Sequence, residues 1–210
     1  MSSGVGFALP DRSPVQFRIS QADGITAYYA GHGADIVSAN QAAVVNNLQF
    51  VPFYTGFGGT IDQVGFNVIT GGTAGSVCRA GIYDSDGTTP GGWLQPRNLL
   101  VDGGEYDTTT ATFKLTTLSP VLTVPPDQLY WLAFLCGVAA PSALTGISSG
   151  WHVLGRSATL AAQFGRVKTG FAYGPLPQTA PTGLGQITSG PPMVVYRWAT
   201  YNSGLRLQGV

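Results

Sequence analysis

Residues 61–93 read IDQVGFNVITGGTAGSVCRAGIYDSDGTTPGGW, and this stretch decides the fold. Apolar residues alternate with small or polar ones over residues 64–68 and again over residues 78–82, which is the period of half-buried β-strands. Residues 71–76, Gly-Gly-Thr-Ala-Gly-Ser, are too rich in glycine to continue a strand and favour a turn. We therefore expect a β-hairpin, followed by a second turn at residues 84–92, where Asp, Gly and Pro cluster.

Outward from this unit, residues 129–136 read LYWLAFLC and show no polar alternation. Such a run predicts a strand that is covered on both faces in the middle of a sheet. We expect it to pair with the strand at residues 77–83. The apolar run ends near Ala140, well short of the roughly 20 residues that cross a bilayer, so no membrane insertion is expected.

Further short strands are expected along the chain, separated by loops of Gly, Ser and Pro. They lie at residues 48–54, 111–116, 121–124, 151–154, 164–168 and 193–200. Pro52 places the first of these at a sheet edge or a strand end. Strands at this spacing, without alternating helices, predict an all-β fold, an antiparallel β-sandwich of jelly-roll-like type.

The length of 210 residues fits one large domain. We expect residues 1–35 to form an N-terminal arm or edge-strand segment and residues 36–210 to form the sandwich. A helix is plausible only at residues 35–47, which contain several alanines. Residues 175–192 are rich in Pro, Gly and Thr and predict a long loop that is functional or clamped against a partner.

Charged residues make up only 10% of the chain, against about 25% in ordinary soluble domains, and the net charge is zero. Such a surface protects poorly against association, which favours an assembly component. All ten acidic residues lie between Asp11 and Asp127, whereas the rest of the chain carries only basic ones. Either the two parts interleave in one sandwich and their charges cancel in space, or opposite faces meet between neighbouring subunits.

Cys78 and Cys136 are the only cysteines, and each lies inside a predicted strand. We favour two buried free thiols, which behave as small hydrophobes. A disulfide is geometrically possible if the two strands are neighbours. The N-terminus lacks a basic start followed by an apolar run, so no secretory signal is visible and synthesis in a cytoplasm is expected.

Catalytic patterns find little support. Residues 146–150 fit the Gly-x-Ser-x-Gly spacing of a hydrolase elbow with His152 close by, but no acidic residue follows Asp127 to complete a triad. A glycosidase needs two carboxylates that face one bond. The crowded acids lie in two glycine-rich turns, where Asp and Glu mostly cap backbone amides: Asp84, Asp86, Asp102, Glu105 and Asp107. We expect no catalytic residues and no enzyme.

Metal and nucleic-acid sites are also not expected. His32 and His152 are the only histidines, and with two strand cysteines they do not form a zinc spacing. Residues 84–87 fit the opening of a calcium loop, but Pro and Gly occupy the later ligand positions. Without a basic run or a phosphate-binding loop, neither a cofactor nor a nucleic-acid partner is predicted.

Aromatic residues near turns are the remaining candidates for function, because exposed rings stack on sugars and anchor protein interfaces. The alternative is that each ring covers an end of the sandwich core. The candidate contact surface comprises Trp93, Tyr106, Trp151, His152 and Tyr173.

The order of several motifs resembles a β-sandwich module of tailed-bacteriophage virion proteins, of the kind found in tail fibres and minor tail proteins. The motifs are residues 61–68, 75–87, 90–91 and 129–133, and the resemblance covers roughly residues 48–150. It implies a non-enzymatic structural or adhesion role in the virion, often as a homotrimer.

The leading hypothesis is therefore a bacteriophage virion protein, a tail fibre, minor tail or adhesion-type subunit. It would associate with itself and with other virion proteins, dock on the particle and contact host surface glycan. A chain this short lacks the long shaft of a full fibre, which keeps open a capsid decoration or head-fibre protein. A non-catalytic carbohydrate-binding module is the alternative of another class.

Overall fold

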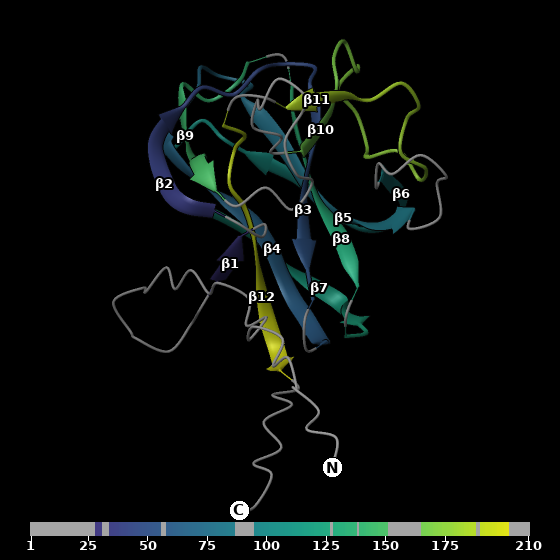
Figure 1. Ribbon diagram of the computed structural model, residues 1–210. Coiled ribbons are helices and arrows are strands. Elements are labelled where there is room, and N and C mark those ends of the chain that lie inside the picture. Colours follow the sequence, from purple (N-terminus) through teal and green to yellow (C-terminus); the bar gives the residue numbers. More distant parts are fainter. Residues whose placement is uncertain are drawn as a thin grey trace, which may run out of the picture.

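The computed structural model of the chain describes residues 28–30, 34–55, 58–86, 95–126, 128–137, 139–150, 165–187 and 190–201. Within these ranges it contains twelve strands and no helix. Two six-stranded antiparallel sheets pack on each other (Figure 1). The predicted all-β antiparallel sandwich is confirmed.

Sheet 1 contains, in spatial order, β1 (Tyr28–Ala30), β12 (Val194–Tyr201), β4 (Gly59–Thr70), β9 (Ala143–Gly150) and β2 (Ala34–Gln41). Its sixth strand, β7 (Phe113–Val124), pairs with the edge of β4 that faces away from β12. Sheet 2 contains, in order, β11 (Gly185–Ile187), β10 (Gly165–Lys168), β3 (Leu48–Tyr54), β8 (Leu129–Cys136), β5 (Val77–Asp86) and β6 (Gln95–Asp107).

The two strands expected on either side of residues 71–76 are present as β4 and β5, but they do not pair with each other. Because β4 lies in sheet 1 and β5 in sheet 2, residues 71–76 carry the chain from one sheet to the other. The predicted hairpin is therefore wrong, and β5 forms its hairpin with β6 instead. The physical reason is burial, since each strand has one apolar face and the two faces are covered when they oppose each other across the core.

The main core lies between the sheets. At its centre, the ring of Phe66 meets those of Tyr106 and Phe134 edge to face, with centroids 5.1 and 5.0 Å away. This is the favoured geometry for aromatic pairs. The three residues come from β4, β6 and β8, so this contact joins the two sheets.

The central position of β8 agrees with its continuous apolar sequence. It pairs with β5, as predicted, and with β3 on its other side. The expectation that Pro52 lies at a sheet edge is correct for the second half of β3, which contains this proline. Strand β10 pairs only with Leu48, Gln49 and Phe50, so the proline lies beyond the end of β10, where no backbone donor is needed.

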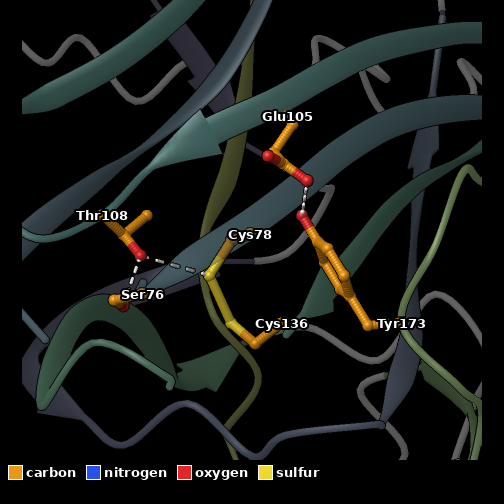
Figure 2. Close-up of a disulfide and its surroundings, with 6 residues drawn as sticks. All are labelled: Ser76, Cys78, Glu105, Thr108, Cys136 and Tyr173. Atoms are coloured by element: carbon orange, nitrogen blue, oxygen red, sulfur yellow. Dashed lines mark hydrogen bonds between the residues drawn. A yellow bond between two sulfur atoms is a disulfide. The ribbon is translucent and has the colours of Figure 1, made fainter. Parts of the chain in front are cut away.

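Cys78 and Cys136 form a disulfide, so the prediction of free thiols is wrong (Figure 2). The two residues are direct partners in the β5–β8 register, with Cα atoms 4.1 Å apart and both side chains fully buried. Beside them, the hydroxyls of Ser76 and Thr108 share a buried hydrogen bond of 2.7 Å. Only the pairing of the strands could decide between thiols and a disulfide.

Two local predictions need correction. Residues 34–41 form β2 and not a helix, because pairing with β9 prevails over the helix propensity of the alanines. The two short strands expected at residues 111–116 and 121–124 are one strand, β7. Its register with β4 is irregular between Thr117 and Leu122, around the cis peptide bond before Pro120.

The N-terminal segment contributes an edge to sheet 1, where Tyr28–Ala30 pairs with β12. Residues 1–27 of the predicted arm lie outside the described residues. The basic C-terminal part interleaves with the acidic part, since β12 pairs with β4 and Arg197 forms an ion pair with Asp62. Within the described residues, this ion pair agrees with the explanation in which the acidic and basic parts interleave in one sandwich and their charges cancel in space.

Candidate functional site

A third layer covers the outer face of sheet 2. It is formed by residues 169–184, here called the strap, which leave β10, cross to β6 and return to β11 (Figure 1). Beneath the strap lies a second hydrophobic cluster, in which Leu176 packs against buried side chains of β3, β5 and β8: Leu48, Phe50, Tyr83, Trp131, Ala133 and Leu135. The loop predicted at residues 175–192 is thus held, in its described part, by its own domain.

Backbone hydrogen bonds fix the far end of the strap to β6. The amide of Leu99 donates to the carbonyl of Gln178 at 2.9 Å, and the amide of Ala180 donates to the carbonyl of Arg97 at 2.6 Å. From sheet 2, beneath the strap, the hydroxyl of Tyr83 donates a hydrogen bond of 2.7 Å to the carbonyl of Pro177. These bonds satisfy part of the outer edge of β6, which would otherwise expose unpaired backbone groups.

Charged groups hold the middle of the strap. The hydroxyl of Tyr173 donates to Glu105 at 3.0 Å, as Figure 2 shows, while the guanidinium of Arg79 lies 6.0 Å from the centroid of the tyrosine ring. Burial, together with the Glu105 carboxylate, raises the pKa of Tyr173, so its hydroxyl stays a donor. Asp102 accepts hydrogen bonds from the amide of Leu176 and from Arg79. The strap is therefore anchored along its length.

A groove of about 450 Å³ lies between the strap and the start of β6, and we call it the terminal groove. One wall is the segment from Thr179 to Leu184 of the strap, and the other comes from Asp86, Gln95, Pro96 and Arg97. The β5–β6 hairpin register, in which Asp86 pairs with Gln95, places the second wall at one end of sheet 2.

Among the charged side chains that line this groove, Arg97 is the most exposed, and an ion pair fixes its position. Its Nη2 donates to Asp84 at 2.8 Å, yet 53% of the arginine side chain remains exposed. Asp84 also accepts hydrogen bonds from the amide and the side chain of Asn98. Burial works to raise the pKa of Asp84, but the hydrogen bonds from Arg97 and Asn98 prevail and hold it below its usual value.

A second groove, also about 450 Å³, lies at the side of the sandwich where β6 and β7 approach each other, and we call it the lateral groove. It is lined by residues 100–102 of β6 and residues 116–122 of β7. Leu100 is 39% exposed and Val121 is 45% exposed. The described residues contain only two other large hydrophobic side chains with comparable exposure, Val44 and Val45, in the connection between β2 and β3.

Only two residues of the predicted aromatic contact surface, Tyr106 and Tyr173, belong to the part of the chain that the structure describes. Trp93, Trp151 and His152 lie outside the described residues. Tyr106 is only 6% exposed and belongs to the main core, so its assignment to a contact surface is wrong. Its hydroxyl donates to the carbonyl of Val64 at 3.0 Å, and burial raises its pKa to about 12. The alternation of β6 about a bulge turns this ring inward.

Tyr173 is partly buried and serves the strap, as described above. The residues of the terminal groove were missed by sequence reasoning. The single signal that could have pointed to them was the length and composition of the loop at residues 175–192.

The two acidic clusters lie in strands β5 and β6, so their assignment to turns is wrong, and several of their carboxylates accept hydrogen bonds within the chain. Asp84 and Asp102 join ion pairs with Arg97 and Arg79, and Asp107 caps the amide of Thr109 at 2.8 Å. Among the described residues, no group of three or more His, Cys, Asp and Glu side chains could hold a metal ion. The same part of the chain has no helix of sufficient length and hydropathy to span a membrane.

The terminal groove, with fixed charges and apolar walls, and the lateral groove, with exposed aliphatic side chains, are thus the two candidate sites. Comparison with known proteins found no matching family model, no matching curated protein and no matching solved structure.

Proposed function

We propose that this chain is a structural protein of a tailed-bacteriophage virion, a subunit of tail-fibre, minor-tail or adhesion type that associates with copies of itself. The motifs that carry the resemblance support this proposal. They fall within the segment that contains β3 to β9, which supplies strands to both sheets and most of the main core.

The use of the carboxylates supports a non-enzymatic role. Asp102 accepts hydrogen bonds from Arg79 and from the amides of Gly104 and Leu176. Asp84 binds Arg97 and Asn98 in a similar way. A catalytic acid must be free to exchange a proton with its substrate, whereas these groups hold the strap and the β5–β6 hairpin in place.

The disulfide supports a position on the outside of the particle. Disulfides persist in oxidising surroundings, which include virion surfaces, and are rare in the cytosol. The Cys78–Cys136 bond lies in the main core, between two central strands of sheet 2. A protein made in the host cytoplasm would acquire this bond on release from the cell.

The lateral groove is the observation that carries self-association. Long hydrophobic edge strands tend to pair with other chains unless charges protect them. Strand β7 has twelve residues but one charged side chain, Lys114, and Val121 lies exposed beside Leu100 of β6. Pro120 interrupts a continuous backbone ladder at this point. The contact with a second copy is therefore expected to be made by side chains.

Gel filtration with light scattering tests the proposal. The purified chain is expected to form a trimer, and Val121→Glu is expected to convert it to a monomer with unchanged circular dichroism. Val44→Glu is the matched control, because Val44 is 50% exposed but lies outside the groove. A wild-type chain that stays monomeric at every concentration would overturn the proposed self-association. Labelling of the subunit on intact phage particles by electron microscopy tests the virion assignment.

A further inference from the structure

The terminal groove has the size and the lining of a small-molecule site. Its volume of about 450 Å³ lies within the usual range of ligand pockets, and such pockets combine apolar walls with a few polar groups that fix orientation. Pro96, Pro181 and Leu184 supply apolar surface, while Thr179 and Thr182 supply hydroxyls. A ligand with an apolar face and several hydrogen-bonding groups fits this combination.

The walls of the groove are held in place without a ligand. The strap wall is fixed by the bond between the Ala180 amide and the Arg97 carbonyl, and on its other side Lys168 donates to the carbonyl of Thr182 at 2.9 Å. The β6 wall is fixed by the β5–β6 register. Little ordering entropy is lost when a ligand enters such a preformed groove, which favours even small ligands that make few contacts.

The charges of the groove select among ligand classes. Asp84 engages Nε and Nη2 of Arg97, and its carboxylate offsets the charge of the guanidinium. Nη1 is not used by this pair and remains as a donor. Asp86 also lines the groove, and the ammonium of Lys168 lies against the strap wall at Thr182, so these four charged groups carry a formal charge of zero. A groove without net charge gives phosphates and acidic sugars no advantage over neutral ligands. A neutral polyhydroxylated ligand can accept a hydrogen bond from Arg97 and donate others to Asp86.

We propose that the terminal groove binds a neutral saccharide, with Arg97, Asp86 and Gln95 contacting its hydroxyls and the proline and leucine side chains covering its apolar C–H face. This inference rests on the adhesion part of the proposed function and places a glycan contact on the strap and β6. Of the two described residues of the predicted aromatic surface, Tyr106 is buried in the core and Tyr173 does not line the groove.

Saturation-transfer NMR on the full chain tests the proposal, with glucose, galactose and N-acetylglucosamine as neutral probes and glucuronic acid and inorganic phosphate as anionic ones. At least one neutral sugar is expected to bind, and its addition should shift amide resonances of residues 179–184. Asp86→Asn and Arg97→Lys should each weaken binding about tenfold, since Lys lacks the planar donors of Arg. Asp107→Asn, at the opposite end of β6, is the control and should bind as the wild type does.

Three results would overturn the assignment: no transfer to any neutral sugar, tighter binding of glucuronic acid or phosphate, or wild-type binding by both groove variants. Circular dichroism and urea unfolding of each variant separate loss of binding from loss of fold. The outcome is independent of the oligomeric state. If the chain forms a trimer but binds no sugar, only the proposed saccharide site is refuted. If the chain is a monomer that binds a neutral sugar, only the proposed self-association is refuted.

Discussion

Removal of the Cys78–Cys136 disulfide should reduce stability by a predictable amount. The bond joins residues 58 positions apart, and a cross-link of this span lowers the entropy of the unfolded chain by an amount worth about 4 kcal/mol at 25 °C. Because the two residues are already direct partners in the β5–β8 register, the bond adds little order to the folded state. Nearly all of its effect should therefore appear in the free energy of unfolding.

Urea unfolding followed by tryptophan fluorescence measures this effect for the oxidised chain, the reduced chain and the Cys78→Ala/Cys136→Ala double variant. The free energy of unfolding should be about 4 kcal/mol lower in the reduced chain and in the double variant than in the oxidised chain. This loss corresponds to a fall of roughly 8–16 °C in Tm for a domain of this size. Thiol titration in denaturant verifies that reduction is complete. If complete reduction leaves the urea midpoint unchanged, the loop-closure reasoning is wrong for this protein.

Three further outcomes are expected. Phe66→Ala should cost about 3–5 kcal/mol in urea unfolding, because it removes a buried ring that joins both sheets; a cost below about 1 kcal/mol would contradict the assigned core. Gly65→Ala should cost about 1–3 kcal/mol, since its Cβ would lie within 1.9 Å of the Lys114 carbonyl oxygen, whereas Gly174→Ala, with no atom within 4 Å, should be neutral. The pKa of Asp84 is lower in the folded chain than its ordinary value of 3.8, so its stabilising contribution is complete above that value and is lost as the pH falls through the folded pKa. The difference between the free energies of unfolding at pH 7 and at pH 3 should accordingly be smaller for Asp84→Asn than for the wild type. Equal differences in the two proteins would refute this assignment.

The sequence by itself determined the fold class, the central strand and most strand positions. These follow from local patterns, since a period of two or a continuous apolar run reports how many faces of a strand are buried. The run at residues 129–136 is an example, because eight consecutive apolar or aromatic residues can be covered only inside a sheet. The scarcity of charge also pointed to association, which remains a prediction.

The tertiary structure alone decided which strands are partners and therefore which side chains meet. Residues 71–76 can turn the chain within one sheet or carry it to another, and the choice depends on burial of distant strands that no local pattern records. The same limit explains the disulfide, which required β5 and β8 to align in register, and the inward position of Tyr106. The terminal groove arises in the same way, because Arg97 and Thr182 become neighbours only when the strap crosses sheet 2.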